Sequence, residues 1–244
     1  MVIRENLAAK VAAELRVFIA DDLQPGAQLP SEKDLAERWG VSRTTLREAL
    51  WLLWSEGLLV RRWGVGTFVA DSSEPVVIGS SSIIPIRDAI RSAGHEPTVS
   101  HGRVERVGAD AEVAQALALD GVATVWRVDR VFDVDETPAV FLRDYVPTLL
   151  NGRELDLTPL TDVNVDLLTL LSGMGRTRVI RMEVQMEAAG ASGEIAALLK
   201  VAPGTPLLRA VQSSYSETGH PVIFSDIHYR TDTVRLRFVR TART

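Results

Sequence analysis

The chain contains no cysteine, and only four of its 244 residues are histidine. Without cysteine there is no disulfide bond and no thiolate metal site, and the composition suits a reducing cytoplasm. No apolar run approaches the ~20 residues that cross a bilayer, so no membrane partner is expected. Met1–Asn6 leads directly into apolar residues at helical spacing, so we expect no signal peptide and a cytoplasmic protein. The apolar residues of this first helix are Leu7, Val11, Leu15 and Phe18.

The scarcity of reactive side chains also argues against an enzyme. The histidines are scattered along the chain without the spacing of metal ligands: His95, His101, His220 and His228. A nucleophile elbow, a glycine loop that cradles phosphate and a zinc motif are all lacking. We therefore expect no catalytic residues, no metal and no cofactor.

Composition indicates a globular protein whose charge is unevenly distributed. The chain is 46% hydrophobic and 24% charged, which suffices for a sizeable core. Its formal net charge is −5, but residues 1–70 carry equal numbers of basic and acidic side chains, so the acidic excess lies in the remainder. A neutral N-terminal part would make few phosphate contacts, and affinity for DNA would depend on dimerisation.

Residues 31–40 have the sequence of a short, capped helix. Ser31 and Asp34 have the spacing of an N-cap and its reciprocal partner, with Asp in place of the usual Glu, so a helix is expected from Glu32. It should end at Gly40, because Gly40 and Val41 supply the tight turn found between the helices of helix-turn-helix units.

A second helix is expected directly after Ser42, which would cap it. Its apolar residues recur at helical spacing and would face a core: Leu46, Ala49, Leu50 and Leu53. Arg43, Thr44 and Arg47 would then lie on the solvent-facing side near the start of the helix. In helix-turn-helix proteins the second helix enters the major groove, where arginine can bind guanine in bidentate fashion.

A two-stranded wing is expected after Gly57, which should end the second helix. Its strands would run through residues 58–62 and 67–69, around a tip that glycine allows to approach phosphates closely. A small helical domain with a hairpin and solvated arginines is the alternative. The order of caps, turn, polar face and glycine-flanked hairpin favours a winged helix-turn-helix that reads double-stranded DNA.

Residues 25–69 resemble the N-terminal domain of the GntR family of bacterial transcription regulators. The resemblance implies that the residues at the family's DNA-contacting positions are Lys33, Arg43, Thr44, Thr45, Arg47 and Gly64. Two residues depart from the family pattern. Val65 stands where a basic residue is usual between the wing glycines, and Trp63, which we keep as a DNA-contact candidate, stands where a polar or basic residue is common. We therefore expect few phosphate contacts from the wing.

Beyond the hairpin the character of the chain changes. Residues 71–79 begin with polar residues and indicate a linker, which predicts domains at 1–70 and 80–244. The second domain alternates β-like runs at 99–107, 124–132, 139–145, 179–187, 207–215 and 222–229 with helices near 111–119, 165–171 and 192–199. This mixture predicts an α+β domain with a mainly antiparallel sheet.

The second domain contains an internal repeat, residues 114–141 and 196–224. Each copy consists of a helix end, a strand that opens on an arginine (Arg127 or Arg209), a hairpin turn and a strand that begins Pro-apolar-apolar-Phe. Two such copies predict a pseudo-symmetric sheet with a binding cleft near their junction, although duplicated packing alone would give the same pattern.

From Ile83 onward the chain resembles the UTRA effector-binding domain, which has a chorismate-lyase-like fold and marks the HutC subfamily of GntR regulators. The motifs that carry the resemblance are IRSAGHEPTV at 90–99, DETPAVFLRDYVP at 135–147 and GHPVIFSDIHYRTD at 219–232. The resemblance implies a homodimer and a small-molecule effector, often a phosphorylated sugar or a product of histidine breakdown.

Sugar-phosphate binders of that subfamily carry polar anchors that this chain lacks. Phe132 stands where they tend to have a second arginine, and apolar Val165, Leu167 and Ile223 replace Ser, Tyr and Glu. Because a phosphate needs several charge-assisted donors, we expect an effector that is less charged and more apolar. With Phe132, the effector candidates are Ser80, Ser81, Ser82, Arg130, Arg143, Tyr145, His228 and Tyr229. A structural hydrogen bond or a solvated surface would explain each of these polar residues equally well.

The sequence favours a dimeric, DNA-binding repressor that binds an inverted repeat and responds to an effector. The resemblance implies a GT-x-TA-x-AC operator core. Two other classes stay open. A chorismate-lyase-like enzyme fused to a DNA-binding head would draw on Arg130, Glu183 and His228, and an architectural DNA-binding protein would need no effector.

Overall fold

The computed structural model describes residues 7–62, 64–71, 76–79 and 83–237. They pack into two units, which we call the head unit (residues up to His95, with Arg235 onward) and the sheet unit (Glu96–Val234). In the described part of the chain, no helix is long and apolar enough to cross a bilayer.

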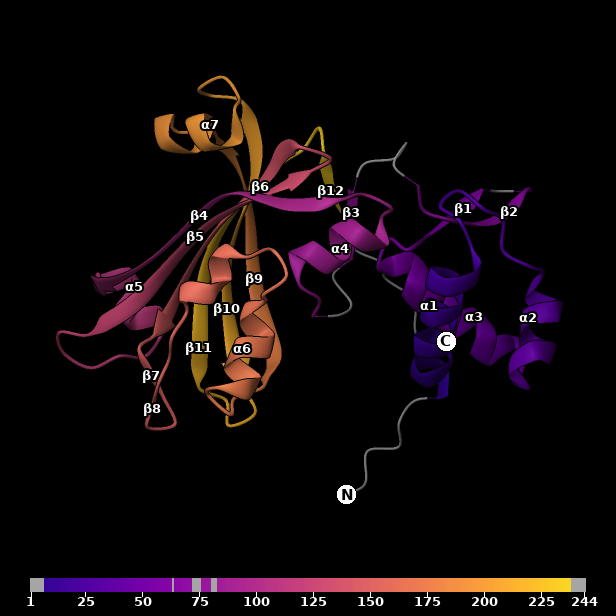
Figure 1. Cartoon of the computed structure of the whole chain (residues 1–244), viewed down its shortest axis with the longest axis horizontal. Helices are drawn as coiled ribbons and strands as arrows, with labels where there is room; N and C mark the ends of the chain where they lie inside the picture. Colours follow the sequence, from indigo (N-terminus) through magenta and orange to yellow (C-terminus); the bar gives the residue numbers. More distant parts are fainter. Residues whose placement is uncertain (1–6, 63, 72–75, 80–82, 238–244) are drawn as a thin grey trace. The chain divides into compact units, whose positions relative to one another are not determined.

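The head unit contains the expected winged helix-turn-helix (Figure 1). Its elements are α1 (Leu7–Asp22), α2 (Glu32–Trp39), α3 (Arg43–Ser55), β1 (Leu59–Arg62), β2 (Gly66–Val69), β3 (Val76–Gly79) and α4 (Ile86–Ser92). Strands β1 and β2 form an antiparallel wing with Arg62 opposite Gly66. The predicted start and end of α2 and the predicted start of α3 are confirmed.

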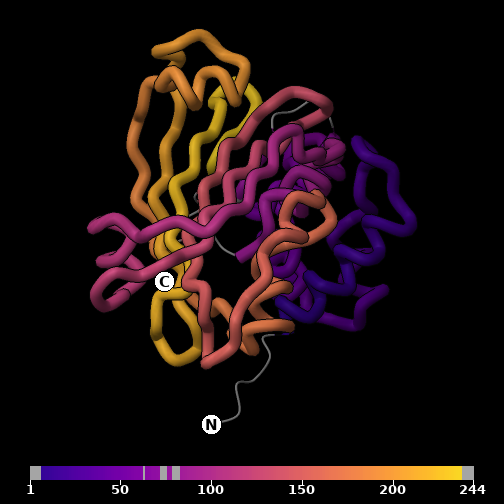
Figure 2. Tube along the Cα trace, turned by 60° about the vertical axis from the view of Figure 1, so that its left-hand side comes forward, coloured from indigo at the N-terminus to yellow at the C-terminus, as the bar shows by residue number. Residues whose placement is uncertain are grey.

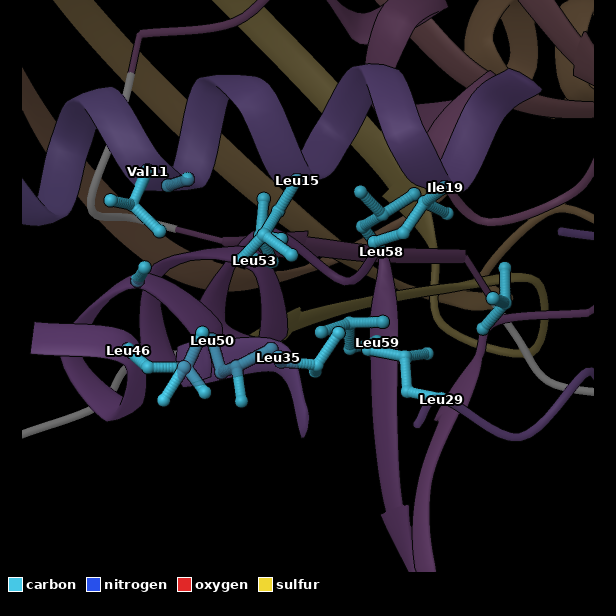
Figure 3. Close-up of a cluster of buried hydrophobic side chains, with 14 residues drawn as sticks. Val11, Leu15, Ile19, Leu29, Leu35, Leu46, Leu50, Leu53, Leu58 and Leu59 are labelled. Atoms are coloured by element: carbon cyan, nitrogen blue, oxygen red, sulfur yellow. The ribbon is translucent and has the colours of Figure 1, made fainter. Parts of the chain in front are cut away.

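The core of the head lies between α1 and α3. Figure 3 shows Val11, Leu15 and Ile19 of α1 pointing toward Leu53 and Leu58, and all five belong to one buried cluster. The apolar residues predicted for the inner face of α3 are buried as expected: Leu46, Ala49, Leu50 and Leu53. The prediction for Leu7 was wrong. This side chain is 54% exposed, and Ala8 and Ile19 complete the buried stripe of α1 instead.

Residues 76–79 form a strand rather than the second half of a linker. Strand β3 pairs with β12 (Val234–Arg237) in a two-stranded sheet, and Val76 is fully buried. Val77 and Ile78 are half-buried, so none of the three apolar side chains is fully exposed, as it would be in a linker. Gly57 makes this packing possible, because a Cβ at that position would lie only 2.4 Å from the carbonyl oxygen of Val77. As a result the two units divide after His95, later than the boundary at 71–79 expected from the sequence.

The sheet unit is built on six antiparallel strands in the order β4-β5-β6-β11-β10-β9. Its elements are β4 (Pro97–Gly108), α5 (Ala111–Ala116), β5 (Thr124–Val134), β6 (Thr137–Pro147), β7 (Leu149–Leu150), β8 (Arg153–Glu154), η1 (Thr158–Thr161), α6 (Leu167–Gly173), β9 (Val179–Gly190), α7 (Gly193–Leu199), β10 (Pro206–Ser216) and β11 (Pro221–Arg230). The expected α+β fold with a mainly antiparallel sheet is confirmed (Figure 1).

The internal repeat accounts for the symmetry of this sheet. The units β4-α5-β5-β6 and β9-α7-β10-β11 occupy its two halves, and β6 and β11 meet in the middle. Equivalent residues make equivalent contacts, since Arg127 pairs with Glu105 in one half and Arg209 pairs with Glu187 in the other. Figure 2 shows the later half in orange and yellow beside the earlier half in magenta.

The two faces of the sheet are covered differently. On one, the α5/α7 face, Val125 and Phe224 pack against α5, and Phe141 packs against α7. On the opposite α6 face, Trp126 and Val128 pack against η1 and α6. Since side chains alternate along a strand, residues of even number between 126 and 132 on β5 point to the α6 face.

Candidate functional site

Local sequence fixes the turn between α2 and α3. Gly40 adopts the left-handed conformation, with φ 61° and ψ 33°, and its N–H is directed at the last carbonyls of α2. Ser31 Oγ accepts a hydrogen bond from the N–H of Asp34, as predicted, and also donates to the Asp34 carboxylate. Ser42 Oγ accepts from the N–H of Thr45 at 3.1 Å. These caps satisfy backbone donors that would otherwise lack partners, so the start of α3 is rigidly defined.

The predicted base-reading face of α3 is solvent-exposed. Arg43, Thr44 and Arg47 are all exposed, whereas the opposite side of the helix lies in the core. Thr45 is only half-exposed, and its hydroxyl lies 2.9 Å from Ser42 Oγ. Its position therefore supports the helix cap, while Arg43 and Thr44 are exposed in the first turn of α3.

An ion pair between the two helices holds Arg47. Its Nε lies 2.7 Å from Glu32 Oε2 at the start of α2, and the arginine side chain remains 66% exposed. Lys33 pairs more loosely with Glu37, at 4.0 Å. Exposed pairs of this kind contribute about 0–1 kcal/mol to stability, so their main effect is on side-chain orientation.

The wing is tied to the segment that precedes α2. Gln28 Nε2 donates to the carbonyl oxygen of Val65 at 3.0 Å, and the N–H of Leu29 donates to Thr67 at 2.8 Å. Gly64 has φ +75° and open space around it, so the tip is accessible. Val65 is 61% exposed and brings an apolar group where a basic one would favour phosphate. Trp63 lies outside the described residues.

A hollow of about 420 Å³ separates the wing from the start of α2. Its lining includes Ser31 and Glu32 from the helix start and Arg61, Arg62 and Gly64 from the wing. Polar and charged groups from both elements thus surround one exposed depression on the head unit.

In the sheet unit, Arg130 forms a buried ion pair that the sequence did not reveal. Its Nη2 lies 3.0 Å from Asp144 Oδ2, and the two side chains are 6% and 5% exposed. Ser225 donates to the other oxygen of Asp144 at 2.6 Å. Burial raises the pKa of Asp144, although Arg130 and Ser225 oppose the effect. Arg130 Nε has no hydrogen-bond partner among the described residues.

Three effector candidates share the α6 face of the sheet. Phe132 lies two residues after Arg130 on β5, and the guanidinium sits 5.2 Å from its ring centroid. Tyr229 lies on the same face of β11, and its pKa is raised by burial and by the nearby Asp144. The apolar replacements noted in the sequence gather on this face as well, because Leu167, Ile223 and the partly buried Val165 belong to one cluster.

The other three described candidates point to the α5/α7 face. Arg143 makes a bidentate pair with Asp129, both bonds at 2.8 Å, which raises the pKa of its guanidinium. Tyr145 stacks on Phe224, with ring centroids 6.2 Å apart. His228 Nε2 lies 3.3 Å from an oxygen of Asp226. A ligand bound on the α6 face would therefore not touch Arg143, Tyr145 or His228 directly. Ser80, Ser81 and Ser82 lie outside the described residues.

Asp226 has an unusually acidic carboxyl. Burial opposes its ionisation, but hydrogen bonds from His228 and Arg209 outweigh that effect and lower the pKa to about 2. Arg209 also pairs with Glu187 at 2.8 Å. The centre of the α5/α7 face is thus a network of paired charges.

Comparison with known proteins decides the family. Residues 7–69 match the bacterial regulatory proteins of the gntR family, and residues 92–235 match the UTRA domain. The chain belongs to the GntR family. Its curated relatives include the HTH-type transcriptional regulator Rv0792c of Mycobacterium tuberculosis, which is 31% identical over 92% of this chain and 82% of the relative. The transcriptional repressor NagR of Bacillus subtilis is 28% identical over 86% of this chain and 84% of its own length.

Solved structures agree with this GntR fold. PhnF from Mycobacterium smegmatis superposes with a TM-score of 0.61 over 96% of this chain and 100% of that structure, at 24% identity. The GntR chain is therefore a DNA-binding transcription regulator with a winged helix-turn-helix head and a UTRA effector-binding domain.

Proposed function

We propose that the protein is a homodimeric repressor that binds an inverted-repeat operator and responds to a small, weakly charged effector. The observation that carries the DNA part is the exposed face of α3, whose first turn is capped and whose far side is anchored in the core. Two such heads in a dimer would meet two half-sites, and the relatives named as repressors support the direction of regulation. The subfamily resemblance suggests a GT-x-TA-x-AC core.

The residues of the head divide by role. Arg43 and Arg47 project from the exposed face of α3 and would read guanine edges in the major groove. Lys33, Thr44 and Thr45 lie at helix starts, where backbone N–H groups also favour phosphate oxygens. Gly64 would let the wing approach the backbone, and Trp63 next to it would contact the groove or support the wing.

The effector would bind on the α6 face of the sheet. Arg130, Phe132 and Tyr229 share this face, and Asp144 already neutralises the charge of Arg130. An anionic group would have to displace that carboxylate, whereas a neutral or apolar ligand fits the surrounding Val165, Leu167 and Ile223. Ser80–Ser82 are retained as candidates. Arg143, Tyr145 and His228 lie on the opposite face, so they would affect effector binding only indirectly, through the strands that carry both faces.

Effector binding would change operator affinity through the dimer. A ligand shifts the heads between binding and non-binding arrangements only as far as it prefers one of them. We expect a coupling free energy between effector binding and operator binding of about 1–3 kcal/mol, which is typical of such regulation.

The base-reading role of α3 is tested by removing one arginine at a time. We expect Arg43→Ala or Arg47→Ala to weaken binding to the operator by about 1–3 kcal/mol, with little change on scrambled DNA. Lys10→Ala on the exposed side of α1 removes the same charge away from α3 and serves as the control. Competition binding on both duplexes measures the effect, and an equal loss on operator and scramble would rule out base reading.

The effector proposal is tested by thermal unfolding with candidate ligands. We expect glucosamine 6-phosphate to leave the midpoint unchanged and a neutral, more apolar ligand to raise it, because binding to the folded state stabilises it. A clear rise with glucosamine 6-phosphate would contradict the proposal.

A further inference from the structure

The edge strand β9 has an apolar side that nothing in the described chain covers. It spans Val179–Gly190 and pairs only with β10, so its outer backbone edge has no partner strand in the described part. Residues 183–188 are all exposed, and Val184 and Met186 on its α6 face are 41% and 38% exposed. Figure 2 shows this strand in orange at the border of the sheet. Long apolar edge strands are templates for pairing with another chain.

The pseudo-symmetry of the sheet makes this exposure specific to β9. The other edge strand, β4, occupies the equivalent place in the first repeat. Glu105 of β4 lies opposite Arg127, as Glu187 of β9 lies opposite Arg209, so Glu105 and Glu187 occupy equivalent positions. The residues directly before them, Val104 and Met186, are therefore equivalent as well. Val104 packs against the cluster formed by η1 and α6. Met186 has no such cover in the part of the chain that the structure describes, although both positions carry an apolar side chain.

The sequence of β9 is complementary to itself when a second copy runs antiparallel. If Val184 lies opposite Val184 of the second copy, Met182 faces Met186, Glu183 faces Gln185, and Arg181 faces Glu187. Almost the whole strand then pairs, with apolar residues opposite apolar ones and opposite charges together. Centring the pair on Glu183 or Gln185 would place two glutamates opposite each other. Centring it on Met182 would shorten the overlap.

We propose that two copies of the protein join through β9, antiparallel and with Val184 at the two-fold axis, so that the two sheets become one. This pairing would be the interface of the homodimer in the proposed function, and the inference rests on that function. The pairing places Val184 and Met186 beside apolar side chains of the second copy and supplies partners to the free backbone groups of β9.

The absence of cysteine allows a direct test. Val184→Cys introduces a single thiol, which in the proposed dimer lies opposite its own copy at about 4.5–5.5 Å between Cβ atoms, within reach of a disulfide. Met186→Cys is the matched control, because its thiol would be displaced from its own copy by four residues, about 13 Å. After mild oxidation of the full chain, we expect most of the Val184→Cys protein to run as a covalent dimer on a non-reducing gel and the Met186→Cys protein to run as a monomer.

The outcomes separate this inference from the proposed function. If light scattering shows a dimer but neither variant cross-links, or both cross-link equally, the β9 register is wrong and the dimeric regulator stands. If the unmodified protein is a monomer at micromolar concentration, both the β9 pairing and the proposed dimer are wrong.

A second variant tests the surface without cross-linking. Val184→Lys places two like charges opposite each other, so we expect the dimer dissociation constant to rise at least tenfold. Because Val184 is exposed in the single chain, the thermal midpoint of the monomer should not change. An unchanged dimer would overturn the proposal.

Discussion

The buried pair between Arg130 and Asp144 offers a sharp test of the account of the α6 face. Both side chains are almost fully removed from water, and among the described residues Asp144 is the single carboxylate paired with Arg130. Asp144→Ala would leave the guanidinium buried without a counter-charge. Breaking such a pair from one side costs about 3–5 kcal/mol, because the remaining charge is uncompensated. For a unit of this size this corresponds to a fall of roughly 10–20 °C in the thermal midpoint.

Urea unfolding followed by circular dichroism measures this change. The control is the double variant Arg130→Met with Asp144→Leu, which removes both charges and should stay within about 2 kcal/mol of the natural protein. A loss below about 1 kcal/mol for Asp144→Ala would mean that the pair behaves as a surface pair, and the reasoning would fail. Millimolar inorganic phosphate should raise the midpoint of Asp144→Ala alone, since an anion can then occupy the vacated place.

Two further predictions concern stability. Gly57→Ala should lower the free energy of unfolding by roughly 2–4 kcal/mol, because φ is +85° and the new Cβ would meet the Val77 carbonyl oxygen. Gly64→Ala also has a positive φ but has open space around it, so it should cost only about 1 kcal/mol in the same urea unfolding experiment. Asp226 has a pKa lowered to about 2, so it stabilises the fold above its ordinary pKa and loses this effect as pH falls toward 2. Because the carboxylate is partly exposed, Asp226→Asn should cost about 1 kcal/mol at pH 7 and nothing near pH 2, and a pH-independent difference would contradict this origin.

Local signals predicted the head unit well. Caps at Ser31 and Ser42 and the glycine at position 40 act within a few residues, so the sequence alone defines where α2 ends and α3 starts. The repeat likewise predicted the pseudo-symmetric sheet, because each copy carries its own strand and turn signals. Pairing between distant segments could not be predicted, and β3 was interpreted as linker because its partner β12 lies more than 150 residues later.

The candidate effector site shows the same limit. Arg130 and Arg143 both looked available from the sequence, yet strand register sends them to opposite faces and gives each a carboxylate partner. Those partners, Asp144 and Asp129, were missed because only the pairing of β5 with β6 brings them within bonding distance. In that pairing Asp129 lies directly opposite Arg143, and Asp144 lies two positions from Leu142, the residue opposite Arg130. Opposite charges at such positions of a predicted hairpin are the signal that would have found both pairs.

The central claim, that a dimer of this GntR regulator reads an inverted repeat, is tested most directly by fluorescence anisotropy. Duplexes with the GT-x-TA-x-AC repeat, one half-site, and a scramble would be titrated at two salt concentrations. The account predicts two chains per repeat, at least a thousandfold weaker binding to the scramble, and weakening with salt by a log–log slope of about −0.9 per phosphate contacted. Equal affinity for repeat and scramble, or one chain per repeat with the half-site bound as tightly, would contradict it.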